Sequence, residues 1–183
     1  MRLFTAIDLS AEVRANIEDL QRKLKPAARL QWSSSANLHI TTKFIGEWPA
    51  SRLGEVNAAL SAMKPVGPIE MAIRGFGWFP EAPPPTVFWV GIQAPAALPA
   101  LAKATDDATA TLGVQRETRP YTPHLTLARL KAQDPLAPLQ QAIRNLPSQE
   151  FGSFIATRYH LYLSESSSSG VVYTKLADFS LLS

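Results

Sequence analysis

The chain has 183 residues, of which 46% are apolar, and a formal net charge of +3 at pH 7. This composition supports one domain or two small lobes with a real core, and it excludes a disordered chain. Because the sequence contains no cysteine, disulfides, thiolate metal sites and a cysteine nucleophile are all excluded. We see no signal peptide and no apolar run long enough to span a bilayer, so we predict a cytoplasmic protein without a membrane partner.

The first half of the sequence predicts the order strand, helix, strand, helix, strand. Apolar residues indicate a strand at 3–9, and they recur at helical spacing over 13–24. A second strand at 38–45 and a second helix at 53–63 follow. Apolar and polar residues then alternate over 69–73, which is typical of a half-buried strand.

The second half repeats this order after a proline-rich linker at 80–85, where successive prolines favour a stiff, extended connection. We predict a strand at 87–92, a helix at 98–112, a strand at 125–130 and a helix capped by Asp134 with Pro135 as its first residue. A strand at 159–163, a Ser-rich loop at 164–170 and one or two strands over 171–182 follow. The sequence therefore predicts one domain over 1–183 built from two similar repeats, at approximately 1–79 and 86–183. Strands and helices alternate along the chain, but neighbouring strands need not be parallel. We predict an α+β fold in which antiparallel or mixed sheets line a central cleft and helices lie outside.

Two of the three histidines lie in matching segments, HITT at 39–42 and HLTL at 124–127. In a strand, a histidine and the residue two positions later share one face. Two imidazoles of pKa near 6.5 can supply a base and an acid at neutral pH, and threonine hydroxyls can hold phosphate oxygens. Opening a cyclic phosphodiester needs those groups on opposite sides of phosphorus. The pattern therefore predicts His39 and His124 as catalytic residues, with Thr41 and Thr126 as phosphate ligands.

Longer segments around both motifs resemble the two-histidine phosphoesterase superfamily and, within it, the bacterial RNA 2′,3′-cyclic phosphodiesterases, also called 2′-5′ RNA ligases. The resemblance covers nearly the whole length. It is carried by LFTAIDLS, NLHITTKFIGE, GFGWFP with VFWVGI, RPYTPHLTLAR, and LYLSES before GVVYTKL. It implies a bilobal, pseudo-twofold fold and an enzyme that hydrolyses 2′,3′-cyclic phosphate ends of RNA to 2′-phosphates without a metal or other cofactor. The reverse reaction would join RNA through a 2′-5′ linkage.

The resemblance also implies roles for individual residues. His39 would be the general acid on the 3′ leaving oxygen and His124 the general base on water. Arg129 would contact the phosphate, and Phe44 would stack on the nucleobase. Simple strand alternation places both on the face opposite their histidines, so each needs a bulge or a strand end to reach the substrate. Lys43 shares alternation with His39, and we expect a solvated edge residue or a phosphate contact there.

Other interpretations remain open at this point. The same chemistry could act on ADP-ribose cyclic phosphate or another small cyclic nucleotide, and the partner could be an RNA end or a nucleotide 2′,3′-cyclic phosphate. The protein could instead bind RNA or a nucleotide without turning it over. A zinc hydrolase is the least attractive alternative, because no Cys or His cluster supplies the remaining ligands. We expect a monomer, a structural role for His160, and core positions for Trp78 and Trp89.

Overall fold

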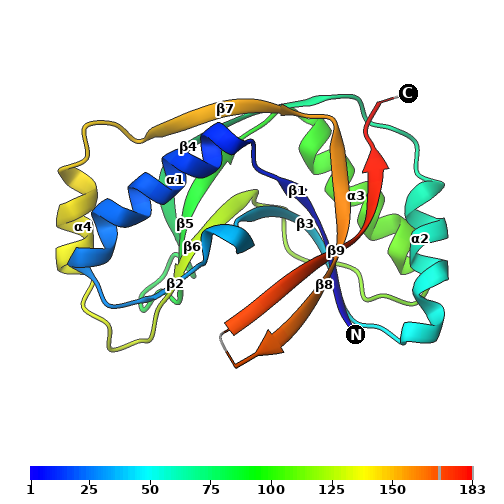
Figure 1. Ribbon diagram of the computed structural model, residues 1–183, viewed down its shortest axis with the longest axis horizontal. Coiled ribbons are helices and arrows are strands. Elements are labelled where there is room, and N and C mark those ends of the chain that lie inside the picture. The colour runs from blue at the N-terminus through cyan, green and yellow to red at the C-terminus, as the bar shows by residue number, and fades with distance from the viewer. Residues whose placement is uncertain (169, 183) are drawn as a thin grey trace.

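Two antiparallel sheets, with helices packed against them, form the protein in the computed structural model, which describes residues 1–168 and 170–182 (Figure 1). One sheet has the strand order β3-β1-β8-β9, and the other has the order β2-β6-β5-β4-β7. The strands of the first sheet are β1 (Arg2–Asp8), β3 (His39–Glu47), β8 (Arg158–Ser167) and β9 (Gly170–Ser180). Those of the second are β2 (Gln31–Trp32), β4 (Ile69–Phe79), β5 (Val87–Gln93), β6 (His124–Arg129) and β7 (Glu150–Ala156).

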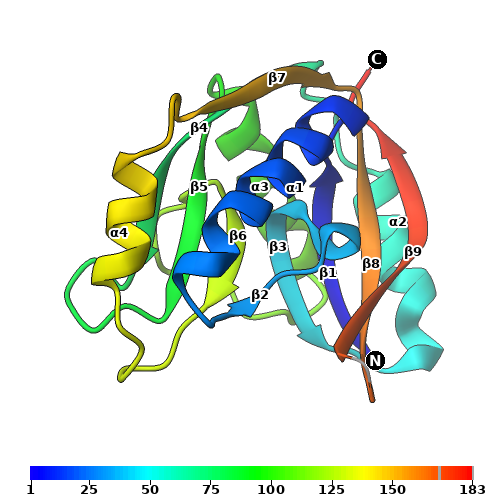
Figure 2. The ribbon, with the colours of Figure 1, turned by 60° about the vertical axis from the view of Figure 1, so that its left-hand side comes forward.

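The helices divide between the two sheets. The helix α1 (Ala11–Leu24) contacts β7 and α4 (Ala137–Arg144), whereas α3 (Ala97–Ala110) contacts β3 and α2 (Leu53–Ser61) (Figure 2). Apolar residues of α1 at helical spacing are buried in the core: Val13, Ile17, Leu20 and Leu24. The predicted α+β class, with antiparallel sheets and helices outside, is confirmed. Over the described part of the chain, no helix combines the length and apolar character that crossing a membrane requires.

Each sheet takes strands from both halves of the sequence. The first sheet joins β1 and β3 to β8 and β9, and the second joins β2 and β4 to β5, β6 and β7. Residues 80–85 close the hairpin between β4 and β5, where the amide of Thr86 donates to the carbonyl of Phe79 over 2.7 Å. The division into repeats at 1–79 and 86–183 stays a prediction.

Two local predictions are wrong. Asp134 does not cap α4, which begins at Ala137. Its carboxylate instead accepts a hydrogen bond of 2.7 Å from the amide of Lys131, because residues 131–134 form a separate turn before the helix. The Ser-rich segment at 164–170 is not a loop throughout, since Ser164–Ser167 pair with β9 as part of β8. Position 169 of that segment lies outside the described residues.

Both motif strands contain a β-bulge at the same position after their histidine. In β3, Ala6 pairs with Thr41 and Thr5 with Lys43, so that β3 has one extra residue. In β6, Trp89 pairs with Thr126 and Phe88 with Ala128, which leaves one extra residue there as well. Two consecutive residues are buried at each bulge, 42–43 and 127–128. A bulge reverses the alternation of side chains, so the first residue beyond each bulge lies on the same face of the strand as the motif histidine.

Candidate active site

His39 and His124 are the first residues of β3 and β6, two strands that belong to different sheets and contact each other near the centre of the molecule (Figure 2). A positive charge on His124 lowers the pKa of His39, so the two imidazoles lie within electrostatic reach of each other. We call the surface that carries His39, Thr41, His124 and Thr126 the motif face.

Each imidazole is held by the backbone two residues upstream. Nδ1 of His124 donates to the carbonyl oxygen of Thr122 over 2.8 Å, and His39 forms a corresponding bond to the backbone of Asn37. Because Nδ1 of His124 is used as a donor, its Nε2 is left to exchange a proton with a ligand. The backbone thus fixes the tautomer and the orientation of that ring.

Both imidazoles favour the neutral form in the free protein. Burial lowers the pKa of His39 to about 4, although the Asn37 bond and the charge of Asp8 act in the opposite direction. Burial also lowers the pKa of His124, the Thr122 bond opposes this shift, and the charge of Arg129 adds to it. An anionic ligand between the rings would favour protonation of both, because it offsets the burial of a positive charge.

The two threonines of the motifs differ from their neighbour Thr42. The hydroxyl of Thr42 is buried and forms a hydrogen bond of 2.7 Å with the hydroxyl of Thr5, so it serves the packing of β3 on β1. The hydroxyls of Thr41 and Thr126 form no hydrogen bond within residues 1–168 and 170–182. Both are half-buried on the motif face and free to donate to a ligand.

The bulges place Phe44 and Arg129 on the motif face, contrary to simple alternation. The Phe44 ring is 64% exposed, and its centroid is 6.2 Å from that of Phe4, which itself packs on His39 at 4.8 Å. Arg129 is exposed and close enough to His124 for its charge to lower the pKa of that imidazole. An exposed aromatic ring is thus joined to His39 through Phe4, and a guanidinium lies within electrostatic reach of His124.

The expectation for Lys43 is wrong. Its side chain is buried on the opposite face of β3, where Nζ lies 2.5 Å from a carboxylate oxygen of Asp106 in α3. The bulge that exposes Phe44 turns Lys43 inward, and an ammonium group buried in this way needs the carboxylate partner. Lys43 is therefore a packing residue on the face of β3 opposite His39 and Thr41.

Aromatic side chains surround both imidazoles. The ring centroid of His39 is 5.0 Å from that of Tyr173, and the centroid of His124 is 4.9 Å from that of Phe79. Trp89, expected in the core, is half-buried with its ring 6.0 Å from His124, whereas Trp78 stacks on the buried Phe88. Sequence reasoning missed Tyr173 and Phe79 as site residues, although GVVYTKL and GFGWFP are among the segments that carry the resemblance.

A polar network supports the sheet beside His39. The carboxylate of Asp8, whose backbone pairs with His39, accepts hydrogen bonds from Tyr162 and, over 2.8 Å, from Lys175. His160 lies between Asp8 and Asp178, with Nδ1 2.6 Å from Asp178. His160 thus connects three strands, which agrees with its expected structural role.

Over the described ranges 1–168 and 170–182, no group of three or more His, Cys, Asp and Glu side chains has the arrangement of a metal site. The donor groups of the motif face are two imidazoles, two hydroxyls and a guanidinium. Such a set matches a phosphate: hydroxyls and guanidinium bind its oxygens, and imidazoles move protons.

The sequence and the fold are similar to those of known proteins. The family model of the 2′-5′ RNA ligase superfamily matches residues 8–166. The RNA 2′,3′-cyclic phosphodiesterase of Methanothermobacter thermautotrophicus is 32% identical over 99% of both chains, and that of Methanocaldococcus jannaschii is 32% identical over 98% of this chain and all of its own. The crystal structure of TT0787 of Thermus thermophilus superposes with a TM-score of 0.82 at 32% identity, covering 99% of this chain and 98% of its own. Escherichia coli LigT complexed with 3′-AMP gives 0.78 at 26% identity, covering 98% and 97%.

Proposed function

The chain belongs to the 2′-5′ RNA ligase superfamily, and from that premise we propose that it hydrolyses 2′,3′-cyclic phosphate ends of RNA to 2′-phosphates, with His39 and His124 as the catalytic pair. One observation carries this proposal. The strands β3 and β6, which belong to different sheets, contact each other, and each has a histidine, a threonine and a bulge at equivalent positions. Proteins that are 32% identical over nearly the full length are RNA 2′,3′-cyclic phosphodiesterases, which supports the same activity here.

Hydrolysis requires an acid and a base on opposite sides of the phosphorus atom. A water molecule attacks phosphorus and gives its proton to His124, while the bond from phosphorus to O3′ breaks and O3′ takes a proton from His39. Exchange of one proton with solvent restores both imidazoles. Each proton transfer contributes ~10²–10⁴-fold to the rate.

The division of roles between the two rings follows the resemblance, because burial lowers the pKa of both imidazoles. The pKa of His39 falls to about 4 although the carboxylate of Asp8 acts in the opposite direction, and the charge of Arg129 adds to the lowering at His124. His39 therefore gains the proton that a general acid needs when the phosphate anion binds and offsets the burial of a positive charge.

The residues beyond the bulges would bind the rest of the substrate. Thr41, Thr126 and the guanidinium of Arg129 can hold the non-bridging phosphate oxygens, where negative charge develops. The exposed ring of Phe44 offers a stacking surface for the terminal base, a contact that tolerates any base. The complex of LigT with 3′-AMP supports a nucleotide as the ligand of this face.

The same geometry serves the reverse reaction, in which a 5′-hydroxyl attacks the cyclic phosphate and forms a 2′-5′ linkage. A cytoplasmic location and a monomeric state stay predictions from the sequence. Turnover of ADP-ribose cyclic phosphate or another small cyclic nucleotide, and RNA binding without turnover, are the outcomes that the following experiment distinguishes.

The test compares three substrates at equal concentration in the presence of EDTA: a nucleoside 2′,3′-cyclic phosphate, a short RNA with a 2′,3′-cyclic phosphate end, and ADP-ribose cyclic phosphate. Phosphorus NMR locates the product phosphate. We expect turnover of both ribonucleotide substrates, fastest on the RNA end, with the phosphate on O2′. Binding of phosphorylated RNA without product over hours would contradict an enzyme, and activity that EDTA removes and zinc restores would contradict the acid–base mechanism.

A further inference from the structure

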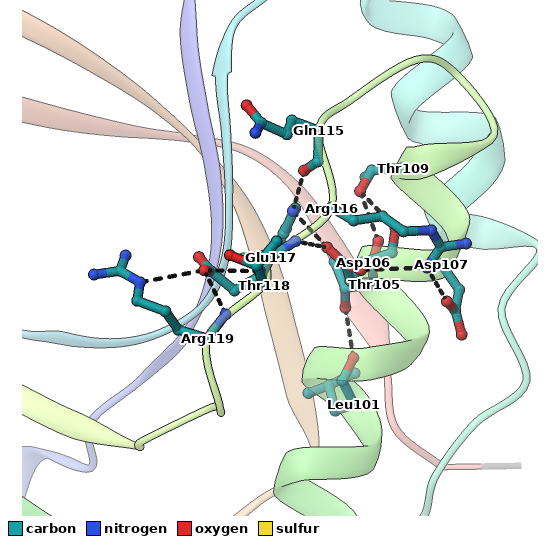
Figure 3. Close-up of polar contacts among 11 residues, drawn as sticks. Leu101, Thr105, Asp106, Asp107, Thr109, Gln115, Arg116, Glu117, Thr118 and Arg119 are labelled. Carbon is teal, nitrogen blue, oxygen red and sulfur yellow. Dashed lines mark hydrogen bonds and ion pairs between the residues drawn. The ribbon is translucent and has the colours of Figure 1, made fainter.

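Residues 115–123, which connect α3 to β6, reach both motif strands, and we call them the bridging segment. Figure 3 shows how the start of this segment is anchored over α3. The carboxylate of Asp106 accepts a hydrogen bond of 3.0 Å from the amide of Glu117, and the guanidinium of Arg116 lies 2.5 Å from Asp107. The segment is thus attached to the helix that covers β3.

The start of the bridging segment is also attached to β3 itself. Nζ of Lys43 donates to the carbonyl oxygen of Gln115 over 2.8 Å and to Asp106 over 2.5 Å. Burial alone would raise the pKa of Asp106, but the bonds from Lys43 and the Glu117 amide hold it below its usual value. A buried ion pair therefore fixes one end of the segment between β3 and α3.

The end of the segment touches both motifs through neighbouring residues. The hydroxyl of Tyr121 donates to the carbonyl oxygen of Thr41 over 2.8 Å. The carbonyl oxygen of the next residue, Thr122, accepts the bond from Nδ1 of His124, also over 2.8 Å. One dipeptide thus joins the backbone of the first motif to the imidazole of the second.

This link matters because no ladder of backbone hydrogen bonds joins the two motif strands. β3 is the edge strand of one sheet, and β6 pairs with β2 and β5 in the other. The distance between the two imidazoles is therefore set by packing and by the bridging segment. Burial raises the pKa of Tyr121, so its hydroxyl remains a neutral donor at all physiological pH values.

We propose that Tyr121 is a positioning residue: its hydrogen bond to Thr41 sets the separation at which His39 and His124 act on one phosphorus atom. The inference rests on the proposed function of the motif face. A change in that separation acts on the transition state, in which both proton transfers occur, more than on substrate binding.

The test variant is Tyr121→Phe, which removes one oxygen atom and keeps the ring. Tyr159→Phe is the matched control, because the Tyr159 hydroxyl also donates to a backbone carbonyl, that of Leu60 over 3.3 Å, away from the motif face. With a nucleoside 2′,3′-cyclic phosphate, we expect kcat of Y121F to fall about tenfold or more, with a smaller change in KM. We expect Y159F to keep the kcat of the wild type.

A second measurement does not depend on turnover. In the wild type, we expect saturating inorganic phosphate to shift the imidazole nitrogen NMR signals of both His39 and His124. In Y121F, at least one of these shifts should decrease at least about twofold, because a ring displaced by ~1 Å loses its contact with the anion.

The outcomes separate the two proposals. A wild-type protein that binds phosphate through both rings but does not open the cyclic phosphate contradicts the proposed function, while the NMR comparison still tests Tyr121. Identical kcat values and phosphate-induced shifts in Y121F and Y159F would overturn the positioning role. A wild-type protein that does not open the cyclic phosphate, and whose imidazole signals do not respond to inorganic phosphate, would overturn both proposals.

Discussion

Gly77 is the position at which a single methyl group should disturb the motif face most directly. It pairs with Trp89 across β4 and β5, and the indole ring lies over it. A Cβ atom at residue 77 would lie 2.0 Å from Cζ2 of Trp89. The ring would have to retreat by about 1.5 Å to reach an ordinary carbon contact. Its centroid lies 5.1 Å from that of Phe79 and 6.0 Å from that of His124, so a shift of the indole disturbs rings of the motif face.

We therefore expect Gly77→Ala to lower the free energy of unfolding by ~1–3 kcal/mol, the usual cost of overpacking. It should also lower kcat on a nucleoside 2′,3′-cyclic phosphate, because the displaced indole presses on His124. Urea unfolding at pH 7 and steady-state kinetics measure the two effects. Gly54→Ala is the control: a Cβ there meets nothing within 4 Å, and alanine in the first turn of α2 should not lower the free energy of unfolding. A Gly77→Ala variant as stable and as active as the wild type would refute the reasoning.

Three further predictions concern charge and exposure. Lys43→Met leaves the partly buried Asp106 without its ammonium partner, so we expect the free energy of unfolding in urea to fall by about 3 kcal/mol. Lys103→Met is the control, because Lys103 belongs to an exposed ion pair and its loss should lower the same free energy by less than ~1 kcal/mol. Burial lowers the pKa of His39 to about 4 from 6.5, so the unfolded chain binds more protons between these pH values, and stability falls as the pH falls through that window. Across this window the free energy of unfolding should fall by about 3 kcal/mol because of His39. A His39→Gln variant whose unfolding free energy depends on pH as that of the wild type does would contradict this prediction. Phe44→Ala should leave the unfolding free energy nearly unchanged, because the ring is 64% exposed, but should raise KM for the cyclic nucleotide about fivefold or more.

Much of the fold could be predicted because its local signals agree with its packing. The helical spacing of apolar residues in α1 and the alternation in β4 correspond to one buried face each. The two motifs were recognisable because they repeat a pair of residue types whose chemistry is specific. Whether the two motifs act on one substrate stays a prediction, because that depends on how β3 and β6, which belong to different sheets, contact each other.

The bulges could not be predicted from alternation. The extra residue in β3 is seen only when Thr41 and Lys43 are paired with neighbouring residues of β1, and the same holds for β6 with β5. This single local irregularity explains why Lys43 was expected on the wrong face. Tyr173 was missed for a related reason, since it reaches His39 only through the pairing order of the whole sheet.

The kinetics of His39→Asn, His124→Asn and the double variant on a nucleoside 2′,3′-cyclic phosphate test the joint action of the two imidazoles most directly. If both rings act on one phosphorus atom, each single variant loses ~10²–10⁴-fold in kcat, and the double variant loses little more than either, because acid and base work as a unit. Single variants that turn over at nearly the wild-type rate, or losses that multiply independently in the double variant, would contradict the account.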